Sequence, residues 1–130
     1  MEMQASSRNI RISATKVRRI ISHIQGCSYE QALVLLEFLP HRACYPVLQL
    51  IVSAAANATN NLGLSKSNLF ISEARVDRST YFKRFRPRAQ GRGYPIRKPT
   101  CHITIKLKET KSQEKAKRWK KLEKDLVLRY

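Results

Sequence analysis

The residues best suited to chemistry in this chain are the basic side chains between Arg78 and Lys98. The stretch contains eight of them and no carboxylate: Arg78, Lys83, Arg84, Arg86, Arg88, Arg92, Arg97 and Lys98. Six are arginines, whose planar guanidinium groups offer several N–H donors in a geometry that fits phosphate oxygens. Four aromatic rings lie among them and offer planes for base stacking: Tyr81, Phe82, Phe85 and Tyr94. This combination predicts binding to nucleic acid, and to RNA first.

The composition of the whole chain also predicts a polyanionic partner. Its 130 residues include 26 lysines and arginines against 9 acids, which gives a formal net charge of +17. Ile96 is the only branched aliphatic residue of the basic stretch, so the stretch cannot order itself by burying apolar surface. A membrane-binding segment would be a basic amphipathic helix, and Pro87, Gly91, Gly93 and Pro95 argue against one. We therefore expect no membrane partner.

Catalytic and metal chemistry have no support in the sequence. The histidines His23, His41 and His102 fall in separate predicted elements, and the acidic residues show no metal-ligand spacing. There is no GxxxxGK[ST] phosphate loop and no HExxH pair. The three cysteines lack CxxC spacing, so neither a disulfide framework nor a zinc site is expected. We expect a protein that is not an enzyme and holds no metal ion or cofactor.

Hydrophobic periodicity indicates the elements that would position the basic stretch. Alternation around Ile10 and Ile12 predicts a short strand that ends at Ser13. A first helix follows, with Ser13 as its N-cap and Gly26 as a left-handed residue after its end. Its apolar stripe consists of Val17, Ile20, Ile21 and Ile24. Its other face carries three cations that we interpret as further RNA contacts: Lys16, Arg18 and Arg19.

Two more helices are predicted. The second opens with a capping box from Ser28 to Gln31 and stops before Pro40. The third runs from about Ala43 to the exit at Gly63 and should be the main core element. Its expected apolar stripe consists of Leu48, Ile51, Val52, Ala55, Ala58 and Leu62.

Two strand patterns bracket the basic stretch, at 69–76 and 101–107. Their antiparallel pairing makes one long hairpin with its turn between Pro87 and Gly93. About a dozen residues in each strand would reach on the order of 40 Å beyond the core at ~3.3 Å per residue. We therefore predict an α+β fold, in which three helices pack on a small antiparallel sheet and a long extended β-hairpin arm projects from it.

The predicted organisation is one domain over residues 1–108. Its globular core comprises residues 6–77 and 101–108, and the arm comprises residues 78–100. A basic C-terminal extension at 109–130 is expected to be helical, because Trp119, Leu122, Leu126 and Leu128 fall roughly on one side. The first residues, MEMQASSRN, have neither signal-peptide nor transit-peptide character, so we expect the protein to work where it is made.

These motifs resemble a known family. KRFRPRAQGR at 83–92, followed nine residues later by HITIKL at 102–107, is similar to the signature of large-subunit ribosomal protein twenty-two. KVRR at 16–19 and SAAANA at 53–58 extend the resemblance over about residues 6 to 108. RACYP at 42–46, SAAANA and TCHITI resemble the form encoded in chloroplasts.

The resemblance implies a structural protein of the large ribosomal subunit that binds 23S-type rRNA and aids its assembly. It also implies that Arg97 and Lys98 hold rRNA phosphates and that the hairpin tip lines the nascent-peptide exit tunnel. The implied tip residues are Phe85, Arg88, Gln90, Gly91 and Arg92, with Gln90 where many members carry lysine. Neighbouring large-subunit proteins and the nascent polypeptide are the other implied partners.

The implied location is on ribosomes in the chloroplast (plastid) stroma, with the bacterial cytoplasm as the alternative. A second function stays open beside the ribosomal one. A free RNA chaperone or a nucleoid-type polyanion-binding protein would carry the same charge, although it would not need an anchored hairpin.

Overall fold

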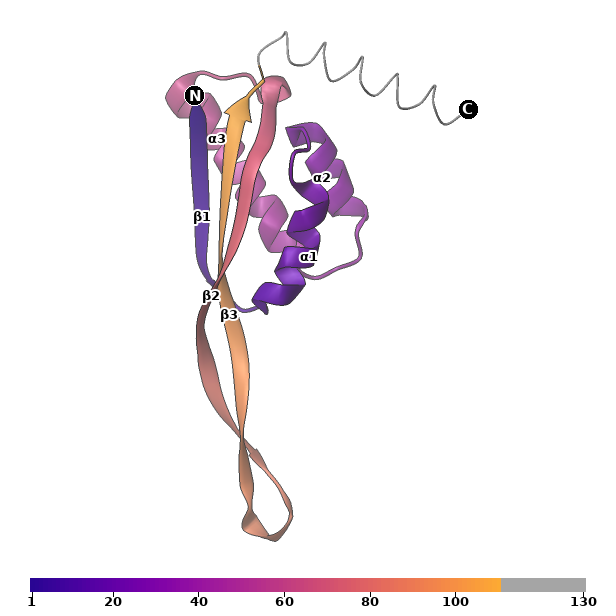
Figure 1. The fold of residues 1–130 in the computed structure, drawn as a ribbon, viewed down its shortest axis with the longest axis vertical. Helices are drawn as coiled ribbons and strands as arrows, with labels where there is room; N and C mark the ends of the chain where they lie inside the picture. The colour runs from indigo at the N-terminus through magenta and orange to yellow at the C-terminus, as the bar shows by residue number, and fades with distance from the viewer. Residues whose placement is uncertain (111–130) are drawn as a thin grey trace, which may run out of the picture.

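The computed structural model describes residues 1–110, which form a three-stranded sheet and three α-helices (Figure 1). The elements are β1 (Glu2–Ile10), α1 (Ala14–Ile24), α2 (Tyr29–Phe38), α3 (Cys44–Leu62), β2 (Leu69–Pro87) and β3 (Gly93–Glu109). The strand order is β1-β3-β2, and both pairings are antiparallel. The predicted α+β fold, with three helices, a small antiparallel sheet and a long hairpin arm, is confirmed.

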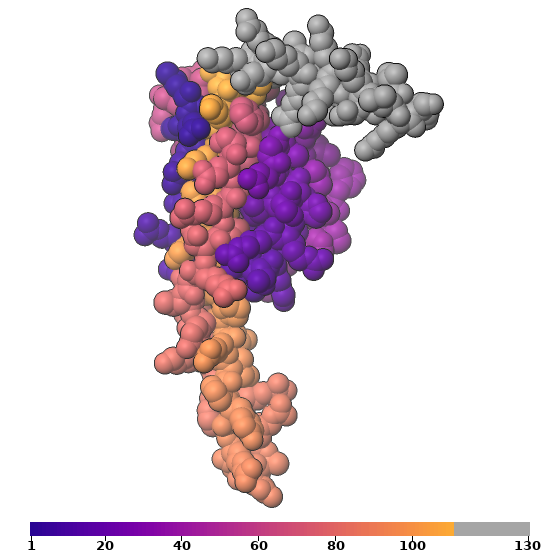
Figure 2. Space-filling view, in the orientation of Figure 1, coloured from indigo at the N-terminus to yellow at the C-terminus, as the bar shows by residue number. Residues whose placement is uncertain are grey.

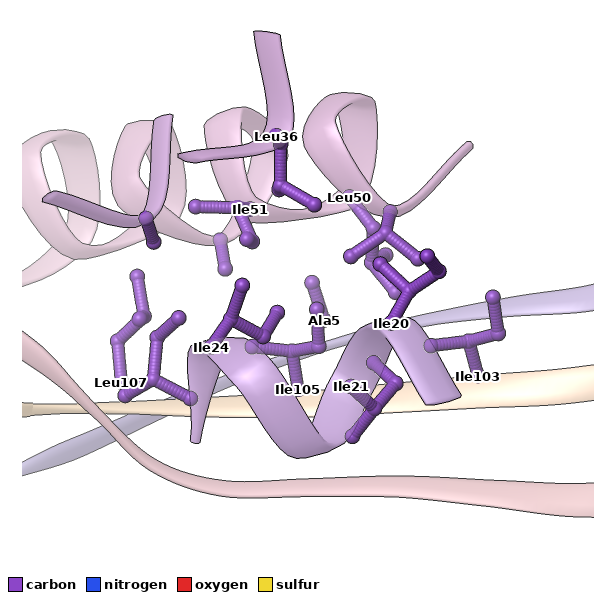
Figure 3. Close-up of a cluster of buried hydrophobic side chains, with 14 of the residues drawn as sticks. Ala5, Ile20, Ile21, Ile24, Leu36, Leu50, Ile51, Ile103, Ile105 and Leu107 are labelled. Atoms are coloured by element: carbon purple, nitrogen blue, oxygen red, sulfur yellow. The ribbon is translucent and has the colours of Figure 1, made fainter. Parts of the chain in front are cut away.

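The core lies between one face of the sheet and the helices. In β3, alternate side chains are fully buried because they point at α1 and α3: Cys101, Ile103, Ile105 and Leu107. They meet the apolar stripe of α1 and the small-residue face of α3 in one cluster (Figure 3). Helix α2 packs beside α3 and adds Leu36 to this cluster. The strict alternation in the sequence of β3 therefore marks its buried face correctly.

A bulge in β2 keeps its apolar side chains on the helix-covered face. Ile71 lies opposite Leu107, whereas Ala74 lies opposite Ile105, and the register shifts between Ile71 and Glu73. Residues three apart in a regular strand point to opposite faces, but the extra residue of the bulge brings Ile71 and Ala74 to the same face. The bulge thus reconciles the sequence of β2 with a single core.

The first strand was predicted too short and too late. It begins at Glu2 and ends at Ile10, and it pairs with β3 from Glu2 opposite Lys108 onward. Only Ala5 of its nine residues is buried. Because most of the strand is exposed, its sequence EMQASSRNI is largely polar and shows almost no alternation of apolar and polar residues. The pairing with β3 supplies the order that local pattern does not indicate.

The predicted apolar stripe of α3 was partly wrong. Val52 and Leu62 are 41% and 36% exposed, whereas Val47, Leu50 and Ala54 are buried. Helix α3 is apolar around most of its circumference, and such a sequence does not define which face turns inward. Contact with β1 and β3 selects the face with the small residues, because alanines permit close approach to the sheet.

The helix ends mostly follow the sequence signals. Ser28 and Gln31 form the predicted capping box, in which each side chain bonds the other residue's backbone N–H. Gly26 and Gly63 adopt the left-handed conformation, with φ of 80° and 64°. Ser13 precedes α1 as predicted, but its hydroxyl lies 2.9 Å from the Thr15 hydroxyl and does not cap the helix.

Strand β3 continues through Glu109, and the backbone N–H of Thr110 donates to the carbonyl of Asn68 at 2.7 Å. The predicted helix of the C-terminal extension falls on residues 111–130, which lie outside the described residues. Within the described part of the chain, no helix has both the length and the apolar character needed to cross a bilayer.

Candidate nucleic-acid interface

The arm consists of the outer halves of β2 and β3, which stay paired from Tyr81 opposite Pro99 to Pro87 opposite Gly93. It extends from the globular part as a narrow projection (Figure 2). Every residue from Tyr81 to Arg92 is exposed. The predicted turn between Pro87 and Gly93 is confirmed. The arm thus presents its side chains to solvent and not to the core of its own chain.

Both faces of the arm combine cations with aromatic rings. Because successive residues of a strand point to opposite faces, the register assigns each pair to one side. One face carries Phe82, Arg84, Arg86, Tyr94, Ile96 and Lys98. The other carries Tyr81, Lys83, Phe85, Pro95 and Arg97. An element built this way is suited to a partner that surrounds it, as folded RNA can, and not to a flat surface on one side.

Three guanidinium groups are held against aromatic rings at the start of the arm. Arg97 lies over the ring of Tyr81 at 4.9 Å from its centroid. Arg84 and Arg11 lie 5.4 and 5.6 Å from the centroid of the Phe82 ring. Such contacts contribute about 0.5–1 kcal/mol each at exposed sites. They restrict the arginine side chains before any anion binds, which lowers the entropy lost on binding.

The tip is a tight turn closed by its own backbone. The N–H of Arg88 donates to the carbonyl of Arg92 at 2.7 Å, and Gln90 and Gly91 both have positive φ, at 61° and 67°. The ring of Phe85 lies directly over Gly93, where a Cβ would approach its Cζ to 1.5 Å. Gly93 therefore permits the position of the Phe85 ring, because any side chain there would displace it.

Irregular pairing marks the point where the arm leaves the globular part. The register of β1 shifts between Ser7 and Ile10, and that of β2 shifts between Arg78 and Tyr81. Both irregularities lie beside Cys101 of β3, because Ile10 and Arg78 pair with it from either side. Bulges increase the local twist of a sheet, so the arm turns relative to the core from this point.

Side-chain hydrogen bonds tie the three strands together at the same level. The N–H of Asn9 donates to Nδ1 of His102 at 3.1 Å, and the Ser79 hydroxyl donates to Oδ1 of Asn9 at 3.2 Å. The hydroxyl of Thr100, which is buried, donates to the carbonyl of Thr80. The root of the arm is thus anchored to the core on both sides of β3.

A basic groove lies where the arm root meets α1 and the segment before α3. Its volume is about 870 Å³. Seven cationic residues line it: Arg11, Lys16, Arg19, Arg42, Arg84, Arg97 and Lys98. No carboxylate is among its lining residues, and Phe82 and Ile96 contribute apolar surface. The groove therefore combines positive charge with an aromatic ring in one concave place.

Within residues 1–110, no acid forms an ion pair with a cation of the arm. The ion pairs of the described residues are Arg75–Asp77, Lys106–Glu73 and Lys108–Glu2, all in the globular part. The hydrogen bond from Lys106 to Glu73, 2.6 Å long, lowers the pKa of that carboxyl. Unneutralised positive charge of this kind attracts polyanions.

Comparison with known proteins agrees with this geometry. The family model for ribosomal protein L22p/L17e matches residues 5–108. The chain belongs to this family. It is 68% identical to "Large ribosomal subunit protein uL22c" of Adiantum capillus-veneris over 112 residues, which cover 86% of this chain and 91% of that protein. The protein of the same name from Angiopteris evecta is 69% identical over 109 residues, which cover 84% of this chain and 92% of its own.

A third relative, from Marchantia polymorpha, is 65% identical over 106 residues, which cover 82% of this chain and 89% of its own. These matches confirm the predicted resemblance to the chloroplast form. The chain is a chloroplast ribosomal protein, and the family is one of structural proteins and not of enzymes.

The structure brings some of the predicted RNA-contact residues together and separates others. Lys16, Arg19, Arg84, Arg97 and Lys98 all line the basic groove. The other predicted contact residues of the basic stretch are exposed outside it: Arg78, Lys83, Arg86, Arg88 and Arg92. The groove also includes Arg11 and Arg42, which sequence reasoning missed. Each is a single cation in a short connecting segment, and only the total charge of the chain pointed to them.

Arg18 has a different environment from its neighbours in α1. Its guanidinium donates to the carbonyl of Val76 at 3.0 Å, although the residue as a whole is exposed. Val76 lies on β2, the edge strand of the sheet, so Arg18 satisfies an edge carbonyl and joins α1 to the sheet. The sequence pattern placed Arg18 and Arg19 on one cationic face, and only tertiary contacts distinguish them.

This difference predicts that alanine at position 18 affects mainly stability, whereas alanine at position 19 affects mainly RNA binding. Arg18→Ala should lower the free energy of unfolding by about 0.5–1.5 kcal/mol, because it removes a hydrogen bond from an exposed side chain to the backbone. Arg19→Ala should change that free energy by less than about 0.5 kcal/mol and should weaken RNA binding instead. Urea denaturation and RNA titration of both variants measure the two effects. Equal losses of stability would contradict the assignment of Arg18.

Proposed function

We propose that this protein is a structural constituent of the large ribosomal subunit that binds its rRNA, aids the folding of that rRNA during assembly and lines the nascent-peptide tunnel with its hairpin tip. The observation that carries this proposal is the arm, which exposes cations and aromatic rings on both faces without any acid. The name of the relatives, a large-subunit protein, supports the same assignment.

The arm explains how binding is coupled to assembly. Its exposed strands pack against little of their own chain, so RNA that folds around them supplies most of their contacts. If six to eight phosphates are neutralised, the logarithm of affinity should fall with the logarithm of salt concentration at a slope of roughly −4 to −7. Specificity then comes from the shape of the folded RNA.

The residues divide into two roles along the arm. The proposed tunnel residues lie at or beside the closed turn: Phe85, Arg88, Gln90, Gly91 and Arg92. Arg97 and Lys98 lie on the returning strand beside the core, where they would hold rRNA phosphates. Neighbouring large-subunit proteins and the nascent chain are the other proposed partners.

Ultraviolet crosslinking in chloroplast lysate, combined with sedimentation, tests this function. We expect the protein to sediment with large subunits and peptides from 85–94 to be crosslinked to a few rRNA sites near the tunnel. Helix α2 contains no lysine or arginine, so its peptides are the internal control and should carry few crosslinks. Crosslinks scattered over many RNAs, with protein found mainly off ribosomes, would favour the free RNA-chaperone function instead.

A further inference from the structure

We propose that the basic groove binds an unpaired nucleotide that projects from the rRNA, with its base stacked at the Phe82 cluster and its flanking phosphates held by the surrounding cations. The proposal rests on the proposed RNA binding and assigns a ligand to one part of the interface. It concerns the groove at the arm root and not the tip.

The shape of the groove favours a projecting nucleotide over a duplex. Three segments far apart in the sequence form its walls: one side of α1 with the residues before it, the segment before α3 and the root of the arm. Its volume of about 870 Å³ lies in the range of about 300–1,000 Å³ that encloses small organic ligands. The surface of an RNA helix is convex, so a paired segment would touch only the rim. A nucleotide that has left the helix can enter.

The chemistry of the groove matches a base and its phosphates together. The Phe82 ring is 41% exposed, and the guanidinium groups of Arg11 and Arg84 lie over it, so that ring and guanidinium planes together form the stacking surface. Unstacked bases are bound on such rings and on arginine planes. Arg11 precedes α1 and Arg84 lies on the arm, so the stack spans the junction between the two parts. A bare anion would use the cations but not the ring.

Charge at the start of α1 adds to the same preference. Lys16 and Arg19 line the groove, and the first turn of α1 contains no acid. Because the hydroxyl of Ser13 does not cap the helix, its positive end stays open to a phosphate. An acidic peptide would also be attracted by this charge, but it would leave the aromatic cluster without a partner.

A fluorescence titration of the full chain tests the inference with two RNA hairpins. One hairpin is fully paired, and the other has a single bulged 2-aminopurine nucleotide. We expect the bulged hairpin to bind about 5-fold to 150-fold more tightly, the range that stacking of one base supplies. We also expect the 2-aminopurine emission to change on binding, since that signal reports stacking of the bulged base.

Matched substitutions locate the effect. Phe82→Leu should abolish the preference for the bulged hairpin, whereas Phe85→Leu, the same change at the tip, should retain it. Arg11→Gln leaves the Phe82 ring in place and removes one guanidinium group, so it should reduce the preference for the bulged hairpin. If Phe82→Leu does not fold, Arg11→Gln serves as the test of the groove assignment.

The possible failures are distinguishable. Equal affinity for both hairpins, with steep salt dependence intact, would overturn the groove assignment and leave RNA binding standing. Full preference retained in Arg11→Gln and Phe82→Leu would also overturn it. Absence of binding to either hairpin at low salt would overturn the proposed function as well. In a competition experiment, an acidic peptide or an unpaired oligonucleotide is added to the complex with the bulged RNA. Displacement by the peptide and not by the oligonucleotide would assign the groove to a protein partner.

Discussion

Replacing Arg84, Arg86, Arg88 and Arg92 together with alanine is expected to lower the affinity for large-subunit rRNA fragments by about 10²–10³-fold near 0.1 M salt. Each phosphate contact to single-stranded RNA releases about 0.7 of a condensed counterion, and the variant would lose four such contacts. The slope of log affinity against log salt concentration should therefore become shallower by about 3. All four side chains are exposed, and the fold should therefore be retained. Filter binding over a range of salt concentrations measures both quantities.

The matched control is the same set of four positions changed to lysine. That variant keeps the charge and should keep the salt slope, while it loses the planar donor geometry and therefore some affinity for folded rRNA. An unchanged slope in the alanine variant would mean that the arm does not contact phosphates. Circular dichroism of both variants checks that the sheet is intact.

Substitution of Ile105 with alanine is expected to lower the free energy of unfolding by about 3 kcal/mol. Its side chain is fully buried, and Figure 3 shows it near Ala5 of β1. On the other side Ile105 pairs with Ala74 of β2. Those two small neighbours cannot fill the cavity left by the truncation. The loss would be a large part of the total stability of about 5–15 kcal/mol for a small domain. Urea denaturation measures it.

Thr104 is the control for this prediction because it is the adjacent residue of the same strand. It points to the opposite face, is only half-buried and lies outside the core cluster. Thr104→Ala should cost less than about 1 kcal/mol. Comparable losses at 104 and 105 would show that the helices do not cover the face to which the register assigns them.

The long hairpin could be predicted because its signals are local and mutually consistent. β3 alternates strictly in its core half, and proline and glycine mark its turn. Each helix has either an apolar stripe or a recognisable end, as in the capping box at Ser28. For these elements the local preferences and the tertiary environment agree, so periodicity was sufficient.

The remaining features depend on contacts between distant segments. β1 is polar and is ordered by pairing with β3. Even the partners nearest in sequence, Ile10 and Cys101, are more than ninety residues apart. The bulge of β2 and the inward face of α3 follow from packing against partners that periodicity does not reveal. The same is true of the groove, because Arg11 and Arg42 become neighbours of the arm only in the folded chain. The separate role of Arg18 is also a tertiary property.

The continuity of β3 from Gly93 to Glu109 restricts how the reach of this protein can change between relatives. Because β3 runs through both core and arm, removing one residue from each strand of the arm would shorten the arm by about 3.3 Å and exchange its two faces. Removing two from each would preserve the faces and shorten it by about 6.6 Å. Arm length is therefore adjustable in discrete steps, and only every second step keeps each side chain directed at the same neighbour.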